Sequence, residues 1–165
     1  MSHPTDQQVS TNFAILVTSD SRNFSTDETG KLAQKLLVEN GHSISSYSII
    51  ENNSIKIMKA IESLISDGVT NAIITSGGTG VSPRDKTIDT VKRLSEKELP
   101  GFGEHFRRLS YEEIGTPGLF SRASAFIIND KIVFCLPGSK GATKTALSRI
   151  IIPSIGHLIW ELNRK

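Results

Sequence analysis

Ala72-Ile-Ile-Thr-Ser-Gly-Gly-Thr-Gly80, followed directly by Val81-Ser-Pro-Arg84-Asp85-Lys-Thr87, is the stretch that decides the fold of this chain. An apolar run typical of a buried strand leads into glycines and small hydroxyl residues, and then into an adjacent arginine and aspartate. Glycines let the backbone approach an anion closely and adopt a positive φ, while exposed N–H groups and the start of a following helix supply positive potential. The stretch predicts an α/β protein that binds a phosphorylated or nucleotide-like ligand at a strand end.

Two better-known glycine motifs do not fit these residues. A Walker A loop needs a glycine directly before Lys86, where this chain has Asp85. A dinucleotide fingerprint counted from Gly78 needs a third small residue where Pro83 stands. The remaining alternative is a plain glycine-rich turn, in which Asp85 or Thr87 serves only as the cap of the next helix.

The segments before this stretch alternate between strand and helix patterns. Apolar runs predict strands over 13–18, 44–50 and 71–76, and apolar residues at helical spacing predict helices over 28–40 and from about 57 to 67. This order, with its short connections, favours a mainly parallel sheet covered by helices. Ligands of such sheets bind at the carboxyl ends of the strands, so the loops 19–27, 51–54 and 76–87 are expected to meet at one cleft.

The second half of the chain adds a different strand pattern. A helix is predicted over 87–94, and Pro100-Gly-Phe-Gly103 is expected to be a break before a helix over 104–114. Residues 125–136 read as two strands joined by a tight Asn129-Asp130 turn, followed by a last helical region that Pro153 either restarts or kinks. The predicted fold is a three-layer α/β/α sandwich with a mainly parallel sheet plus an antiparallel hairpin. We expect a single domain over 12–165 after a disordered tail over 1–11.

Composition excludes several other classes of protein. With 165 residues, of which 37% are hydrophobic, the chain can build one core. The net charge is only +2 and the basic residues are dispersed, which argues against nucleic-acid binding. No apolar stretch approaches the roughly 18 residues of a membrane span, so we expect a cytoplasmic protein without membrane contact. Cys135 has no cysteine partner and the four histidines are scattered, so we expect Cys135 in the core and any metal to arrive with the ligand.

Six separated motifs together resemble the MogA/MoaB family of molybdenum cofactor biosynthesis. In chain order they are Val17-Thr-Ser-Asp20-Ser21-Arg22, Ser76-Gly-Gly-Thr-Gly80, Arg84-Asp85-Lys-Thr87, Pro100-Gly-Phe-Gly-Glu104, Ser121-Arg122 and Leu136-Pro-Gly-Ser139. Each motif is weak by itself. Their common order, over a match from about Phe13 to Leu162, makes the resemblance specific.

The resemblance implies a fold, an activity and partners. Members of the family are α/β sandwiches that commonly form homotrimers or homohexamers. Their best-defined activity transfers AMP from Mg-ATP to the terminal phosphate of molybdopterin and releases pyrophosphate. The resemblance therefore implies molybdopterin and ATP as partners, and Mg²⁺ as the cofactor.

The resemblance also assigns roles to residues. It implies that Asp85 is catalytic and holds Mg²⁺, directly or through water. Residues implied in substrate or nucleotide binding are Asp20, Ser21, Arg22, Ser76, Gly77, Gly78, Thr79, Gly80, Arg84, Thr87, Glu104, Ser121, Arg122 and Ser139. Several polar candidates have a plainer alternative: Asp85 and Ser139 as helix caps, Arg84 as a solvated side chain, Asp20 and Ser21 as turn residues, and Glu104 as a helix-start carboxylate.

One position departs from the family pattern. Catalytic members carry an aspartate just after the second strand, and the corresponding residue here is Asn52. Asn52 has no negative charge for a magnesium ion, although its carbonyl oxygen can coordinate a cation or bind substrate. Three functions stay open: an adenylyltransferase that depends on Asp85 with Asn52 beside it, a non-catalytic molybdopterin carrier or assembly protein, and a nucleotide-handling hydrolase on the same fold.

Overall fold

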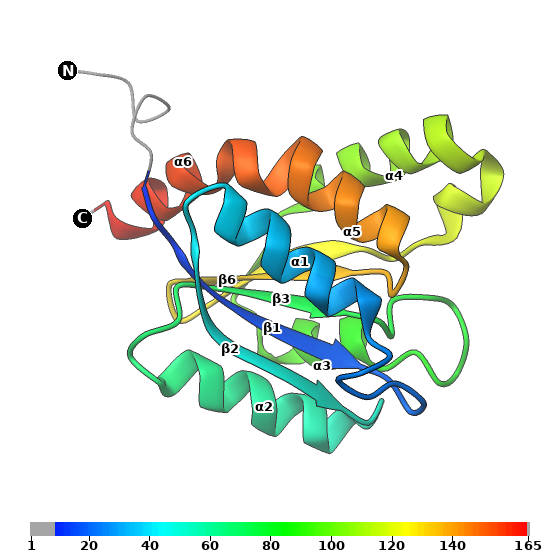
Figure 1. Cartoon of the computed structure of the whole chain (residues 1–165), viewed down its shortest axis with the longest axis horizontal. Coiled ribbons are helices and arrows are strands. Elements are labelled where there is room, and N and C mark those ends of the chain that lie inside the picture. The colour runs from blue at the N-terminus through cyan, green and yellow to red at the C-terminus, as the bar shows by residue number, and fades with distance from the viewer. Residues whose placement is uncertain (1–8, 165) are drawn as a thin grey trace.

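A mixed sheet of six strands forms the centre of the protein, in the order β2-β1-β3-β6-β5-β4. The computed structural model describes residues 9–164 (Figure 1). The strands are β1 (Asn12–Thr18), β2 (Ser43–Ile50), β3 (Ala72–Ser76), β4 (Lys97–Glu98), β5 (Ser124–Ile128) and β6 (Lys131–Leu136). The strands β2, β1, β3 and β6 pair in parallel, whereas β5 pairs antiparallel with both β6 and β4. The predicted parallel sheet with an added hairpin is confirmed.

Helices cover both faces of this sheet (Figure 1). On one face lie α1 (Glu28–Glu39), α4 (Pro100–Ile114), α5 (Lys140–Ala146) and α6 (Ile152–Asn163), and on the other lie α2 (Ser54–Ser66) and α3 (Thr87–Leu94). Alternate residues of each strand feed the two layers. In β1, Phe13 and Ile15 pack with the first layer, while Ala14 and Leu16 pack with the second. The predicted α/β/α sandwich is therefore confirmed.

The start of α4 differs from the sequence-based expectation. We expected a break over 100–103, but the helix already begins at Pro100. Proline fits the first turn of a helix, where its missing N–H would have no partner. Gly103 lies inside the helix because a Cβ there would be 2.6 Å from the carbonyl oxygen of Ala123, so glycine allows α4 to approach the chain before β5. The break prediction is wrong because Pro100 fits the first turn and Gly103 serves close packing.

Two other local predictions are informative. Asn129 and Asp130 both have positive φ, 46° and 60°, which confirms the tight turn between β5 and β6. Pro153 lies in the first turn of α6, directly after the π-helical turn η3 (Leu147–Ile151). Proline removes one helical hydrogen bond, so the helical region both changes its winding and restarts here.

The beginning of the described chain is better ordered than expected. Residues 1–8 of the predicted disordered tail lie outside the described residues. Thr11, the last residue of that predicted tail, is buried, and its carbonyl oxygen accepts a hydrogen bond of 3.1 Å from the Ser43 N–H. Cys135 is buried in β6, as predicted, and burial raises its pKa to about 12. Among residues 9–164, no helix combines the length and the apolar character needed to cross a membrane.

Asp67 fastens the turn between α2 and β3. Its Oδ1 accepts hydrogen bonds from the backbone N–H groups of Val69 and Thr70 at 2.9 and 2.8 Å, and its Oδ2 accepts one from the Thr70 hydroxyl. Burial alone would raise the pKa of Asp67, but these hydrogen bonds and the charge of Lys131 outweigh it and lower the pKa to about 2. The ionised carboxylate therefore stabilises the folded state.

We expect Asp67→Ala to lower the free energy of unfolding by about 2 kcal/mol at neutral pH, because it removes hydrogen bonds to a charged group. The folded-state pKa lies below the unfolded value of about 3.9, so this stabilisation is complete above about pH 4 and disappears as the pH falls towards 2. Urea unfolding of both proteins between pH 7 and pH 3 measures the difference. A difference that stays constant over this range would contradict the role of the charge.

Candidate functional site

The loop after β3 depends on two glycines with positive φ. Gly77 and Gly78 have φ values of 102° and 69°. A Cβ at Gly77 would lie 2.4 Å from the carbonyl oxygen of Thr18, so the loop passes directly over the end of β1. The Gly77 N–H donates to the Leu136 carbonyl oxygen at 2.9 Å, which joins the loop to the end of β6. The glycines thus bring the ends of three parallel strands together.

Buried hydroxyl groups support this loop from below. The Oγ1 atoms of Thr18 and Thr87 lie 3.1 Å apart, and the Thr18 hydroxyl donates to the Ser76 carbonyl oxygen at 3.3 Å. The Thr87 N–H also donates to the Gly78 carbonyl oxygen at 3.1 Å. The N-cap of α3 is Lys86, without a side-chain cap, so the helix-cap alternative for Thr87 is wrong. Thr87 and Ser76 lie beneath the loop.

Asp85 closes the turn that precedes α3. Its Oδ2 accepts a hydrogen bond from the Ser82 N–H at 2.9 Å, and its own N–H donates to the Ser82 carbonyl oxygen at 2.9 Å. A Cβ at Gly80 would lie 2.7 Å from the same Oδ2, so glycine is needed beside this carboxylate. Because Lys86 is the N-cap of α3, the helix-cap alternative for Asp85 is also wrong.

A cleft of about 390 Å³ opens beside the glycine loop. One wall is made of polar backbone and small side chains, and the opposite wall is made of apolar side chains from α4 and the 3₁₀ helix η2 (Thr116–Phe120). Predicted site residues in its lining are Gly78, Thr79, Gly80, Asp85, Ser121 and Ser139. Residues that the sequence did not indicate include Phe106, Ser110, Ile114, Pro117, Gly118 and Phe120. The cleft can hold a flat ring against the apolar wall and a phosphate against the backbone.

A second cleft, of about 430 Å³, shares Val81 and Asp85 with the first. Lys86, Arg93 and Arg122 bring positive charge to it, and Asp89 brings negative charge. Asp85 lines both clefts. A carboxylate between two ligand-sized spaces is suited to organise a cation shared by two anionic ligands.

Arg122 fastens the glycine loop to α3. Its Nε donates to the Gly80 carbonyl oxygen at 2.9 Å, and its two terminal nitrogens reach the two carboxylate oxygens of Asp89 at 3.1 Å. The hydrogen bond from Arg122 is the largest cause that lowers the pKa of Asp89. The Arg122 N–H also donates to the Thr79 carbonyl oxygen at 3.0 Å. Arg122 therefore holds the wall between the two clefts.

Asn52 links its own loop to two neighbouring loops by hydrogen bonds, which together we call the Asn52 strap. Its Nδ2 donates to the carbonyl oxygen of Arg84, and its N–H donates to Asp20 Oδ1 at 2.9 Å. Its Oδ1 is buried without a hydrogen-bond partner and faces Gly78, where a Cβ would lie 3.0 Å away. An aspartate could not donate to the Arg84 carbonyl oxygen, so the amide is what makes the strap possible.

The donor set near the clefts suits Mg²⁺ better than a metal held by protein ligands alone. Within residues 9–164, no group of three or more His, Cys, Asp or Glu side chains stands close enough to hold a metal ion. The Asp85 carboxylate lines both clefts, whereas Asn52 Oδ1 is buried against Gly78 and Asn52 lines neither cleft. Mg²⁺ commonly binds through one or two carboxylates plus water and substrate phosphates, so Asp85 fits that ion.

Comparison with known proteins places this geometry in a family. The family described as "Probable molybdopterin binding domain" matches residues 14–157. The chain belongs to this family of molybdopterin-binding domains. The resemblance to MogA/MoaB proteins predicted from the six motifs is confirmed.

Several relatives resemble this molybdopterin-binding domain over nearly its full length. Molybdenum cofactor biosynthesis protein B of Staphylococcus aureus is 45% identical over 154 residues, which are 92% of this chain and 91% of the relative. A crystal structure of a molybdenum cofactor biosynthesis protein B superposes with a TM-score of 0.93 at 39% identity, covering 96% of this chain and 99% of the other. The tungsten cofactor synthesizing protein MoaB from Pyrococcus furiosus has a TM-score of 0.84 at 34% identity, covering 94% and 98%.

Other predicted residues of this molybdopterin-binding domain lie outside the clefts. Asp20, Ser21, Arg84 and Glu104 are exposed, and none of these four lines either cleft. Because α4 begins at Pro100 and has no acidic residue in its first turn, the helix-start alternative for Glu104 is wrong. The Arg22 side chain turns inward to internal partners. Ligand binding by these residues stays a prediction.

Ser139 combines two of the roles considered for it. Its hydroxyl oxygen accepts a hydrogen bond from the Ala142 N–H at 3.2 Å, so the predicted cap of the last helical region is confirmed. The same residue lines the first cleft of the molybdopterin-binding domain. A signal for the opposite wall was present in Phe106 and Ser110, which lie four positions apart and therefore on one face of α4. The sequence alone does not say which cleft that helix face borders.

Proposed function

We propose that this protein takes part in molybdenum cofactor biosynthesis by transferring an adenylyl group from Mg-ATP to the terminal phosphate of molybdopterin. The observation that carries the proposal is the position of Asp85, which lines two adjoining clefts of ligand size. One cleft suits a pterin with a phosphate, and the other suits the phosphates of a nucleotide. Family membership supports the first ligand.

Molybdopterin is expected in the cleft of about 390 Å³. The exposed apolar side chains of Pro117 and Phe120 would pack against the pterin ring. Backbone N–H groups of residues 78–80, in a loop held open by positive φ at Gly77 and Gly78, would bind the terminal phosphate. The phosphate would then point towards Asp85 and the second cleft.

ATP is expected in the cleft of about 430 Å³, where Lys86 and Arg93 supply positive charge for its phosphates. A phosphate oxygen of molybdopterin attacks the α-phosphorus of ATP, a new P–O bond forms, and the bond to the departing pyrophosphate breaks. Mg²⁺ would supply charge neutralisation for this step. Because the attacking group is already an anion, the protein mainly has to hold the two anionic ligands in the orientation in which they react. Asp85 is the residue that would hold the ion, directly or through water.

The alternative is a carrier or assembly protein that binds molybdopterin without reacting it. The observation that favours this alternative is the strap of Asn52, whose amide replaces a carboxylate of catalytic family members and bonds to the Arg84 carbonyl oxygen. This arrangement leaves Asp85 as the carboxylate on which the reaction would depend. The two functions share the pterin cleft and differ in the use of ATP.

Mass spectrometry of purified protein mixed with molybdopterin and Mg-ATP tests the proposal. Adenylylated molybdopterin together with an equal amount of pyrophosphate is the expected result. Bound molybdopterin without adenylylated product would reject adenylyl transfer and support the carrier. ATP consumption that does not require molybdopterin would instead identify a hydrolase.

We also propose that the protein forms a homotrimer or homohexamer in the cytoplasm. Two large apolar side chains that line neither cleft are exposed at the end of α4 and in η2: Tyr111 and Leu119, each at 50%. Such a patch is typical of a surface that another protein chain covers. Light scattering on the purified protein gives the mass, and a monomer at micromolar concentration would contradict the proposal.

A further inference from the structure

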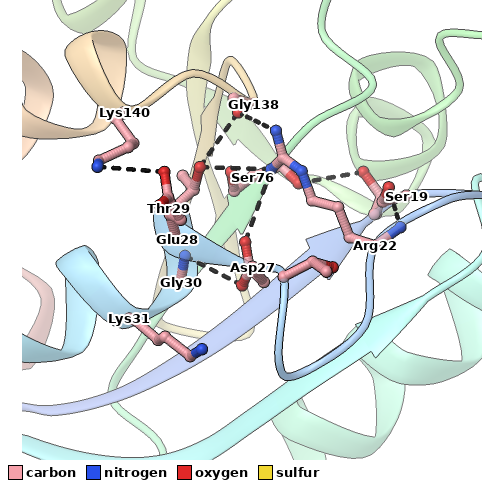
Figure 2. A network of polar contacts seen from close by, with 12 residues as sticks. Ser19, Arg22, Asp27, Glu28, Thr29, Gly30, Lys31, Ser76, Gly138 and Lys140 are labelled. Carbon is pink, nitrogen blue, oxygen red and sulfur yellow. Dashed lines mark hydrogen bonds and ion pairs between the residues drawn. The ribbon is translucent and has the colours of Figure 1, made fainter.

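A buried carboxylate lies behind the first cleft and joins three segments of the chain. Asp27 is 0% exposed and caps α1, since its Oδ2 accepts a hydrogen bond from the Gly30 N–H at 3.1 Å. The same oxygen accepts a hydrogen bond of 2.6 Å from the Tyr47 hydroxyl in β2. Its other oxygen, Oδ1, has no hydrogen-bond partner but lies 3.6 Å from Arg22 Nη1. Figure 2 shows Asp27 facing Arg22 across this gap.

Arg22 carries the connection on to the cleft. Its Nη2 donates to the Gly138 carbonyl oxygen at 2.7 Å, and its Nη1 donates to Thr29 Oγ1 at 3.3 Å (Figure 2). The Thr29 hydroxyl donates to the same carbonyl oxygen at 3.2 Å. Gly138 and the next residue, Ser139, line the cleft of about 390 Å³. Two donors from the segment 22–29 therefore hold one carbonyl oxygen of the cleft wall.

Asp27 depends on these partners because it is a charge removed from water. A buried carboxylate is stable only when it is paired and hydrogen-bonded. Burial raises the pKa of Tyr47, and the hydrogen bond to Asp27 raises that pKa further, so the phenol stays a donor at ordinary pH. A Cβ at Gly30 would lie 2.3 Å from Asp27 Oδ2, so the chain leaves room for the carboxylate at this one place.

We propose that Asp27 and Arg22 are positioning residues, which fix the Gly138 wall of the molybdopterin cleft before the ligand binds. Asp27 orients the guanidinium, and the guanidinium holds the Gly138 carbonyl oxygen and thereby the start of α5. This role differs from the direct ligand contact that the family resemblance implies for Arg22. The part of the proposal that concerns the ligand rests on the function proposed above.

The test compares Arg22→Gln, Asp27→Asn and the double variant by their KM for molybdopterin and their kcat in the adenylyl-transfer assay. Asp27→Asn keeps the size of the side chain and an oxygen that can accept from Gly30 and Tyr47, but it removes the charge that faces Arg22. We expect KM to rise by about tenfold in each single variant with little change in kcat. The double variant should be no worse than either single one, because the two residues act in series.

Lys140→Gln is the matched control. Lys140 pairs with Glu28 at 3.2 Å across the same joint between α1 and α5, but both side chains are exposed, at 57% and 70%. Exposed ion pairs contribute little, so this variant should behave like the parent. Thermal unfolding of every variant checks that the fold is retained. Arg22→Lys should raise the KM for molybdopterin less than Arg22→Gln does, because its ammonium can still donate to one acceptor.

Three results would overturn the proposal. A large loss in Arg22→Gln with parental behaviour in Asp27→Asn would make Arg22 a direct ligand contact. Parental KM in both variants would show that the cleft wall does not need this connection. Hydrogen exchange at the backbone N–H of Ala142, measured without ligand, separates this proposal from the proposed function. Faster exchange in both variants supports positioning even if the parent does not adenylylate molybdopterin, and unchanged exchange in both rejects it.

Discussion

Asp85→Asn is expected to lower Mg-ATP-dependent adenylyl transfer by about a hundredfold or more, with no comparable loss of stability. The reason is the place of this carboxylate between two clefts, where a negative charge can hold a cation near both phosphate groups. The amide keeps an oxygen that can accept the hydrogen bond from the Ser82 N–H, so the turn before α3 should survive. Initial rates over a range of Mg²⁺ concentrations measure the effect.

Glu39→Gln is the control for the loss of one negative charge. Glu39 is exposed at the end of α1, pairs with Lys35 at 3.9 Å, and lines neither cleft. Its rate and Mg²⁺ requirement should equal those of the parent. Equal rates in the parent and in Asp85→Asn would mean that Asp85 only closes the Ser82 turn, and would move the assignment towards the carrier.

The sheet and most helices could be predicted because their signals are local. An apolar run such as 72–76 is typical of a strand that is covered on both faces. Ile57 and Ile61 lie on one side of α2, so that side is the one that packs against the sheet. The start of α4 could not be predicted in this way. The glycines at 101 and 103 are helix breakers by propensity, and only the approach of Ala123 to Gly103 makes a glycine suitable there.

The candidate site likewise has a part that the sequence predicts and a part that it does not. Residues 78–80 and Asp85 line one cleft, as expected where the carboxyl ends of parallel strands meet at one edge of a sheet. The loop 19–27 was expected there too, but none of its residues lines either cleft, and Ser54 is the one residue of 51–54 that lines the second. The apolar wall from Phe106 and Phe120 depends on how α4 and η2 fold back over that edge, which is a long-range contact. Loop position also does not determine where an arginine points. Arg22 and Arg122 both belong to recognisable motifs, yet each guanidinium donates a hydrogen bond to a carbonyl oxygen of the protein itself.

The amide at position 52 changes how the glycine loop is held. A carboxylate there would face the Arg84 carbonyl oxygen without a proton to share, and the two oxygens would repel each other. The Asn52 amide instead donates to the carbonyl oxygen of Arg84, the residue before Asp85, and the Asn52 N–H donates to the Asp20 carboxylate. Of the two carboxylates that line the second cleft, Asp89 is paired with Arg122, so a cation would depend on Asp85 and a large effect is expected from a single substitution.

Gly78→Ala is expected to lower the free energy of unfolding by about 2–4 kcal/mol and to weaken molybdopterin binding by at least about tenfold. Gly78 has φ 69°, and a Cβ there would lie 2.3 Å from Thr87 Oγ1. Thr87 is buried, and its hydroxyl lies 3.1 Å from that of Thr18, so this stiff side chain has little room to move. The loop would have to lift from the strand ends and would displace the N–H groups expected to bind phosphate.

Gly68→Ala separates backbone strain from this steric conflict. Gly68 has φ 71°, almost the same as Gly78, but a Cβ there meets no atom within 4 Å. It should therefore cost only the left-handed backbone strain, about 1 kcal/mol, and leave molybdopterin binding unchanged. Urea unfolding and ligand titration of both variants give the comparison. Equal losses of stability in the two variants would contradict the tight packing of the loop on Thr87, whereas an excess in Gly78→Ala measures how strongly that packing holds the phosphate-binding backbone in place.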